Sequence, residues 1–250
     1  MTAPLQRTAP VDWRESVTGT NAVIKSLAAE RELDEGYALV AYHQTQGRGR
    51  LGRSFSSPEG GVYLSVLFYP GDDLVRVSTL TPCAAVAVCR AIERVCGVTP
   101  GIKWPNDLLL GKRKLCGILT ESFHSHSRRA VVVGIGINVN TPVSAFDADV
   151  QSVAVSLAAH LGAEVDRAAV ASSVIEELDK LYLAWQNDTR CVLSDYRRLC
   201  VSTDRPVSLI LGDSTRSAYA VGIDDDYALL AEVDGKTERI TMGEVSLREA

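Results

Sequence analysis

The pattern of apolar residues changes at about Ser202, and this change constrains the fold more than any other feature of the chain. Before it, apolar runs of strand length alternate with longer segments that carry apolar residues at helical spacing. After it, short strands at regular spacing are separated by turns rich in glycine and aspartate. Such strands do not easily extend an α+β core and are typical of a small β-barrel. We therefore predict an α+β domain over residues 1–201 and a small, separate β-barrel domain over residues 202–250.

Capping and turn residues place the predicted elements. Thr20 is a good helix N-cap, Thr81-Pro82 is a good helix start, and Gly97 is a typical helix end. The basic turn at residues 111–114 predicts a hairpin. The predicted helices cover residues 21–31, 81–96, 152–161 and 167–187, and the predicted strands cover residues 37–42, 61–69, 102–110, 115–123 and 128–139. In the second domain, strands are predicted at residues 207–211, 217–223, 228–233 and 237–242.

Composition excludes several classes of protein. The 250 residues are 46% hydrophobic and 23% charged, which is ample for a globular core. The net charge of −5 argues against general nucleic-acid binding. Residues 1–10 lack the apolar stretch of a signal peptide, and no apolar run reaches the roughly 18 residues of a membrane span. We therefore expect a cytoplasmic protein. No Cys-x-x-Cys pair occurs among its six cysteines, so we expect them to be buried free thiols: Cys83, Cys89, Cys96, Cys116, Cys191 and Cys200.

A glycine-broken basic segment is hard to explain by packing alone. Arg48, Arg50 and Arg53 lie close together, with no acidic residue between His43 and Pro58. The intervening glycines allow backbone N–H groups to approach an anion closely. A solvated flexible loop is the alternative, but the density of arginines favours a mobile loop that closes over a phosphate or carboxylate ligand.

Common nucleotide and catalytic motifs do not fit. Gly47-x-Gly49-x-x-Gly52 matches the dinucleotide-binding fingerprint in letters, but the residues that follow do not open a helix. Gly111-Lys112 fails the P-loop pattern, and no G-x-S-x-G segment is present. His124-Ser-His126 has the character of a metal site, but it has no further cysteine or histidine partners nearby.

Three further segments carry candidate site residues. Lys103 lies within an apolar run before Trp104-Pro105-Asn106-Asp107, where a buried lysine needs an anionic partner such as Asp107. Lys114 stands at the mouth of an apolar strand, and Gly117 lets a ligand lie against the backbone. Asn138 ends a glycine-containing strand, where it can hold a phosphate-bound metal or water. Each has an alternative explanation. The segment after Lys103 can be a simple turn, Lys114 can be a solvated lysine of the hairpin turn, and Asn138 can be a hydrogen-bonded polar residue at a strand end.

Taken together, these segments resemble the biotin protein ligase family from about Thr18 to the end of the chain. Order and spacing agree over Thr20-Asn21, Gln44, Gly47-Arg48-Gly49-Arg50-Leu51-Gly52, Lys103-Trp104-Pro105-Asn106-Asp107, Lys114-Leu115-Cys116-Gly117-Ile118-Leu119 and Gly134-Ile135-Gly136-Ile137-Asn138. The resemblance implies an α+β catalytic domain with a mixed sheet and a small C-terminal SH3-like barrel. It also implies a two-step reaction. ATP activates biotin to biotinyl-5′-AMP, and biotin is then transferred to a specific lysine of a biotin carboxyl carrier domain.

The resemblance also implies a role for each matching residue. Arg48, Arg50, Lys103, Lys114 and Asp107 would be catalytic, with Lys114 bridging the biotin carboxylate and the α-phosphate, and Asp107 near the incoming lysine. The biotin pocket would be formed by Thr20, Asn21, Gln44, Gly47, Arg48, Gly49, Arg50, Lys114 and Gly117. ATP would be bound by Arg48, Arg50, Lys103, Asn106, Lys114 and Asn138. Mg²⁺ would be held mainly by the ATP phosphates, with Asn138 as a further contact.

The chain departs from the family pattern at two places. Gly19 stands where the family often has serine, so one hydroxyl of the ureido site is missing. No tryptophan occurs between Asn138 and Ala159, where some members use one to cover adenine.

Only about seventeen residues precede the motifs, so we expect a monofunctional ligase that binds neither DNA nor membrane. The fold also allows a homodimer through a sheet edge. The alternatives are a lipoate ligase and a non-catalytic biotin or adenylate sensor.

Overall fold

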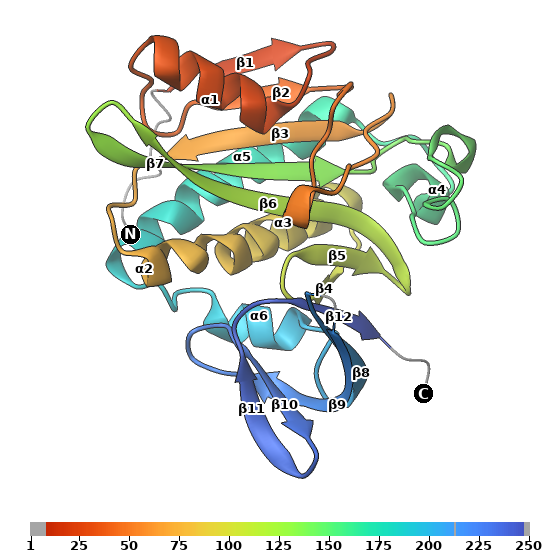
Figure 1. The fold of residues 1–250 in the computed structure, drawn as a ribbon. Coiled ribbons are helices and arrows are strands. Elements are labelled where there is room, and N and C mark those ends of the chain that lie inside the picture. Colours follow the sequence, from red (N-terminus) through yellow and green to blue (C-terminus); the bar gives the residue numbers. More distant parts are fainter. Residues whose placement is uncertain (1–8, 213, 248–250) are drawn as a thin grey trace.

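The computed structural model describes residues 9–212 and 214–247. Within these residues the strands form a seven-stranded sheet and a five-stranded sheet (Figure 1). The larger sheet has the order β1-β2-β3-β7-β6-β5-β4, with bounds β1 Val11–Arg14, β2 Ala38–Ala41, β3 Val62–Phe68, β4 Gly101–Lys103, β5 Asp107–Leu110, β6 Arg113–Ser125 and β7 Arg128–Ile137. The helices are α1 Thr20–Glu30, α2 Leu74–Ser78, α3 Leu80–Cys96, α4 Leu157–Leu161, α5 Arg167–Asn187 and α6 Leu193–Leu199, with short 3-10 helices at Arg50–Gly52 and Val143–Ala145.

Helices cover both faces of the central strands, as the alternation of side chains requires. Leu64 of β3 and Val133 of β7 belong to the core under α3 and α5, whereas Leu67 and Val132 pack on the opposite face with Ile24 of α1. This is why β3 is buried at every position and is apolar except at Ser65. β1 pairs parallel with β2 and the other neighbouring strands are antiparallel, so the predicted mixed sheet and α+β class are confirmed.

The long core helix α3 begins slightly earlier than predicted. Its N-cap is Thr79, so Thr81-Pro82 lies inside the first turn, and it ends as predicted at Gly97 in the left-handed conformation. By length and by the mean hydropathy of an 18-residue window within it, the stretch Leu74–Cys96 would suffice to cross a membrane, although it is not an uninterrupted apolar run. Because 72% of this window is buried inside the fold, it is accounted for as a core helix.

Three predicted features were wrong. Residues 102–110 form two antiparallel strands, because the chain reverses at the cis Trp104–Pro105 peptide. Helix α4 begins only at Leu157, because Ala154 forms a parallel bridge with Lys114 and Ser156 caps the helix. The N-cap of α1 is Gly19 rather than Thr20, whose hydroxyl has other partners. Elements β1, α2, α6 and the last strand, each of seven residues or fewer, were not predicted.

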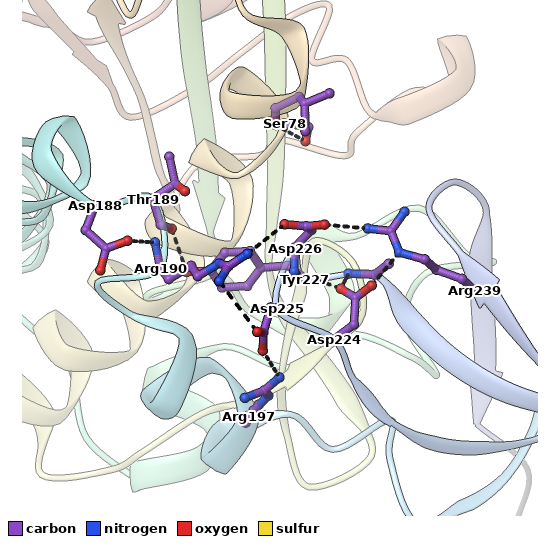
Figure 2. A network of polar contacts seen from close by, with 12 residues as sticks. Ser78, Asp188, Thr189, Arg190, Arg197, Asp224, Asp225, Asp226, Tyr227 and Arg239 are labelled. Carbon is purple, nitrogen blue, oxygen red and sulfur yellow. Dashed lines mark hydrogen bonds and ion pairs between the residues drawn. The ribbon is translucent and has the colours of Figure 1, made fainter.

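The smaller sheet is antiparallel and is fastened to the rest of the chain. Its order is β11-β10-β9-β8-β12, with bounds β8 Arg205–Leu211, β9 Ser214–Ile223, β10 Leu229–Val233, β11 Lys236–Ile240 and β12 Glu244–Leu247. Its apolar face shares one core with α3 and α5, so it has its own sheet but no separate core. Figure 2 shows the turn before β10, where Tyr227 donates to the Thr189 carbonyl at 2.8 Å and Asp225 accepts from Arg197 at 2.8 Å. Arg239 binds both Asp224 and Asp226.

Candidate active site

A cavity of about 750 Å³, here called the main cavity, opens where α1, the β4–β5 turn and the middle of β6 and β7 meet the basic loop. We define the basic loop as residues 47–53. The cavity brings together most of the residues that the sequence singled out: Thr20, Asn21, Gln44, Arg48, Gly49, Arg50, Lys103, Asn106, Asp107, Lys114 and Gly117. Gly47 and Asn138 do not line it.

One end of the main cavity is cationic. Lys114 Nζ lies 2.7 Å from Asp107 Oδ1, and Lys103 Nζ lies 3.9 Å from Asp107 Oδ2. Lys114 and Gly117 are three positions apart, which in a regular strand would place them on opposite faces. A shift in the β5–β6 register makes Leu115 an extra residue, so that Lys114 and Gly117 share a face. The predicted pairing of Lys103 with Asp107 is present, but Lys114 is the closer partner.

The basic loop is held against the smaller sheet. Arg50 Nη1 donates to Asn106 Oδ1 and to the Gly243 carbonyl, both at 3.1 Å. Arg53 Nη1 lies 2.8 Å from Glu244 Oε2, which also lines the main cavity. Arg48, in contrast, makes no side-chain hydrogen bond or ion pair with any described residue, so its guanidinium is available to an anion.

Gly47 has a packing role rather than a place on the cavity wall. A Cβ added there would come within 2.4 Å of both the Phe55 carbonyl oxygen and Ser57 Oγ. The absence of a side chain therefore lets the loop fold back, with Phe55 N donating to the Gly47 carbonyl at 2.9 Å. The prediction that Gly47 contacts the ligand stays untested.

An aromatic ring covers the floor of the cavity. Ideal Cβ atoms on Gly117 and Gly136 would lie 2.9 Å and 2.4 Å from ring carbons of Phe55. Gly117 was predicted to let a ligand approach the strand, but here it accommodates the Phe55 ring. Lys114 Nζ lies 5.7 Å from the centre of the same ring. Phe55 therefore forms an apolar surface between the two ends of the cavity.

The other end of the cavity is a hydrogen-bonding network. Gln44 Oε1 accepts from the Thr20 backbone N–H at 2.8 Å, and Gln44 Nε2 donates to Ser57 Oγ at 2.9 Å. Ser65 Oγ lies 2.6 Å from both Thr20 Oγ1 and Asn21 Oδ1. Gln44 keeps one amide proton for a ligand, and Thr20 Oγ1 faces the same space.

Asn21 is committed to this network. Its Nδ2 donates to the Leu119 carbonyl at 3.2 Å and to Glu121 Oε2 at 2.8 Å. Gly134 makes the arrangement possible, because a Cβ there would lie 2.3 Å from Asn21 Oδ1. Both amide protons of Asn21 are therefore used inside the protein.

Asn138 holds the backbone around Lys114 rather than facing the cavity. It is 5% exposed, and its Nδ2 donates to the Lys114 carbonyl at 3.3 Å and to the Val155 carbonyl at 3.2 Å. The segment after it runs beside Lys114, whose backbone N–H donates to the Val153 carbonyl at 2.7 Å. Val153, 54% exposed, lies in the segment where the family resemblance implies an adenine-covering side chain.

The described residues contain no group of three histidine, cysteine, aspartate or glutamate side chains that could hold a metal ion. The cavity residues that sequence reasoning missed include Lys25, Phe55, Glu121 and Glu244, and Ser57 and Ser65 hydrogen-bond to cavity residues from behind. Arg53, which the sequence singled out only as part of the basic segment, also lines the cavity. One signal was available for Ser65, which is a polar residue inside an otherwise apolar strand. No local pattern links Glu244 to a loop almost two hundred residues earlier.

Comparisons with known proteins agree with this geometry. Residues 13–138 match the Biotin/lipoate A/B protein ligase family, and residues 203–248 match the Biotin protein ligase C terminal domain. The chain is 35% identical over 224 residues to the Bifunctional ligase/repressor BirA of Bacillus subtilis, covering 88% of this chain and 68% of that one. It is 33% identical over 245 residues to the Biotin--[acetyl-CoA-carboxylase] ligase of Mycobacterium tuberculosis, covering 93% and 89%. The structure of Biotin protein ligase from Aquifex aeolicus in complex with biotin and ATP matches with a TM-score of 0.83 and 28% identity, covering 98% of this chain and 100% of that one.

Proposed function

Because the chain belongs to the biotin/lipoate protein ligase family and is a biotin ligase that uses ATP, we propose that it attaches biotin to a lysine of a biotin carboxyl carrier domain. The observation that carries the proposal is a single cavity with a cationic end at Lys114 and a hydrogen-bonding end at Thr20 and Gln44. An acid with a polar ring at its far end fits such a cavity.

The cationic end supports the first step. A carboxylate oxygen of biotin attacks the α-phosphorus of ATP, and the bond to the pyrophosphate oxygen breaks, which gives biotinyl-5′-AMP and pyrophosphate. Both reactants are anions, so Lys114, Arg48 and Arg50 lower the cost of bringing them together and stabilise charge in the transition state. Lys103 adds positive charge beside Asp107. Asn106 accepts a hydrogen bond from Arg50, which supports a role for Asn106 in orienting that guanidinium.

Magnesium fits as a companion of the nucleotide. Asp107 is a single carboxylate at the cationic end and it is already paired with Lys114, which agrees with an ion held mainly by phosphates. Mg²⁺ bound there would neutralise charge on the leaving pyrophosphate. Asn138 is too buried, and its amide nitrogen too committed, to serve as the ion's principal contact.

The second step needs a neutral amine. The carrier lysine attacks the carbonyl carbon of the mixed anhydride, AMP leaves, and the amine nitrogen loses a proton as the amide forms. Asp107 Oδ1 lies beside Lys114, close to where that carbonyl would be held, so it is the group placed to take the proton. Closure of the basic loop would keep water from the anhydride.

An open strand edge of β6 supports the proposed approach of the carrier to the site. β5 pairs with β6 only as far as Gly117, and the pairing ends where Ile118 N donates to the Asn106 carbonyl at 3.0 Å. Beyond this point no described strand pairs with that edge of β6. A second cavity of about 600 Å³ lies along it and shares Asn106 with the main cavity. A strand of the carrier added to this edge would bring its lysine to Asp107, and a second copy of the chain is the alternative occupant.

The test is ATP-dependent pyrophosphate release with Mg²⁺ and biotin, lipoate or no acid, followed by transfer to a purified carrier domain. Release with biotin alone and labelling of one carrier lysine are expected. Release with lipoate would instead indicate the sister activity of this family. Tight biotin binding without any release would contradict catalysis and favour a sensor.

A further inference from the structure

The hydrogen-bonding end of the main cavity contains an ion pair that the proposed mechanism does not use. Glu121 Oε1 lies 2.7 Å from Lys25 Nζ, while Glu121 Oε2 accepts from Asn21 Nδ2 at 2.8 Å. Glu121 and Lys25 line the cavity and their side chains are about one-third exposed (33% and 35%). A pair with this exposure adds little to the stability of a fold, so stability alone does not explain a carboxylate here.

Glu121 lies well away from the cationic end. It shares a face of β6 with Gly117, above which Lys114 Nζ is placed. Four residues along a strand span about 13 Å. The carboxylate therefore faces the far part of a bound acid rather than its own carboxylate group.

The carboxylate fixes the orientation of the Asn21 amide. Glu121 and the Leu119 carbonyl are both acceptors, so the Asn21 NH₂ group must face them and its oxygen must face Ser65. Ser65 is fully buried, and its one hydroxyl proton goes to Asn21 Oδ1, which can only accept.

This orientation sets the direction of the next hydrogen bond. Ser65 Oγ has no proton left for Thr20 Oγ1, which lies 2.6 Å away, so the proton of this contact must come from Thr20. Gln44 Oε1, at 3.2 Å from Thr20 Oγ1, competes for the same proton, but the contact with Ser65 is the shorter one. Thr20 Oγ1 then presents its free lone pairs to the cavity. If the Asn21 amide turned over, Ser65 would receive a proton from it and would donate to Thr20, and the acceptor would be partly used.

We propose that Glu121, held by Lys25, is a positioning residue that makes this end of the cavity an acceptor for ring N–H groups of the acid. The inference rests on the proposed function and deepens it by naming what selects the ring. A cyclic urea such as that of biotin supplies N–H donors, whereas a dithiolane supplies none and leaves the acceptor unpaired. A site built to bind a donor rejects analogues that lack it.

The test compares two double variants that remove the same charges. Lys25→Met/Glu121→Gln keeps a carbonyl oxygen for Asn21 Nδ2, whereas Lys25→Met/Glu121→Leu does not. Biotin Kd is measured by calorimetry, together with kcat and the KM values for biotin and ATP from pyrophosphate release. Glu30→Leu, on the exposed part of α1, is the matched control for adding a leucine.

We expect the Gln double variant to bind biotin within about threefold of the wild type and the Leu double variant to bind about tenfold or more weakly. The KM for ATP should not change in either double variant. In the Leu double variant, a biotin analogue methylated on its urea nitrogens should lose far less affinity than biotin does. Equal biotin affinity in the two double variants, or a parallel rise in KM for ATP, would overturn the inference. If the wild type releases no pyrophosphate with biotin, the proposed function itself fails, which is a distinct result.

Discussion

Lys114 and Asp107 face each other across the β5–β6 hairpin, with the ammonium nitrogen 2.7 Å from a carboxylate oxygen. The register shift in the hairpin places both side chains at the same end of the main cavity. Substrate anions must therefore compete with Asp107 for Lys114. The two residues have different proposed roles. Lys114 acts on the phosphate and the biotin carboxylate, whereas Asp107 acts on the amine of the carrier lysine.

Lys114→Met should abolish most of the adenylation step. Removing one preorganised cation from the reacting oxygens lowers the rate by about 10²–10³-fold. Pyrophosphate release with biotin and ATP measures the effect. Lys112→Met, two residues earlier in the exposed turn, is the matched control and should keep full activity. Equal losses in the two variants would contradict the assignment.

Asp107→Asn should slow transfer to the carrier more than adenylation. Loss of a general base costs about 10²-fold or more, and the amide cannot take the proton. Raising the pH should recover part of the transfer rate, because the carrier lysine, with an ordinary pKa of about 10.4, then arrives more often as the free amine. Single-turnover transfer from preformed biotinyl-5′-AMP checks this. A rate that falls equally in both steps and ignores pH would rule out the assigned role.

Glu244→Gln should loosen the basic loop. Arg53 loses its ion pair, although Arg50 still donates to the Gly243 carbonyl. An exposed ion pair contributes only about 0.5 kcal/mol, so trypsin should cut within residues 47–53 about twofold faster. Biotin with ATP should restore protection. Glu238→Gln, which removes a pair with Arg216 inside the smaller sheet, should leave the cutting rate unchanged.

The sequence predicted the elements whose signals are local. Helix α5 has the predicted bounds, and the hairpin at residues 111–114 and the end of α3 at Gly97 follow from turn and capping chemistry. The site motifs converge because the start of α1, the basic loop, the β4–β5 turn and parts of β6 and β7 meet at the main cavity. The mixed sheet and the biotin-ligase fold were likewise correct expectations.

What the sequence could not supply depends on non-local contacts. The strand over residues 102–110 is divided because Lys103 and Asp107 become cross-strand partners, which no periodicity reveals. Asn21 lines the main cavity, where its predicted contact with the ligand stays untested, and no local pattern shows that its amide donates to Glu121, a hundred residues away. Residues 152–156 have helical spacing, yet residues 152 and 153 form a turn and Ala154 bridges to Lys114, so the helix begins only at Leu157.

Gly19→Ser should strengthen biotin binding. The backbone at Gly19 is extended (φ −174°), and an added Cβ would lie 3.4 Å from the Gln46 carbonyl oxygen and 3.9 Å from Gln44 Oε1, so a side chain fits. The new hydroxyl faces the hydrogen-bonding end and should lower Kd by about three- to tenfold. Gly19→Ala adds the same Cβ without the hydroxyl and is the control. If alanine gives the same gain as serine, the hydroxyl is not responsible.

Thiol reactivity should follow burial and the pairing of two cysteines. Burial raises the pKa of the Cys116 thiol, and burial with the nearby Glu93 raises that of Cys89 to about 12. The pKa of Cys191 is lowered, because the Cys83 thiol donates a hydrogen bond to it. Cys191 is also partly exposed, as is Cys96, whose pKa is raised by burial.

Iodoacetamide at pH 8 should therefore label Cys191 first and Cys96 more slowly, since the thiolate is the nucleophile. Lowering the pH to 7 should slow Cys96 by about tenfold, because a thiol below its pKa loses a factor of ten in thiolate per pH unit. Cys191, whose pKa is lowered, should slow by no more than Cys96. Peptide mass spectrometry measures each rate, with urea-unfolded protein as the control in which all six thiols react. Early labelling of Cys116 in the folded protein would contradict its burial.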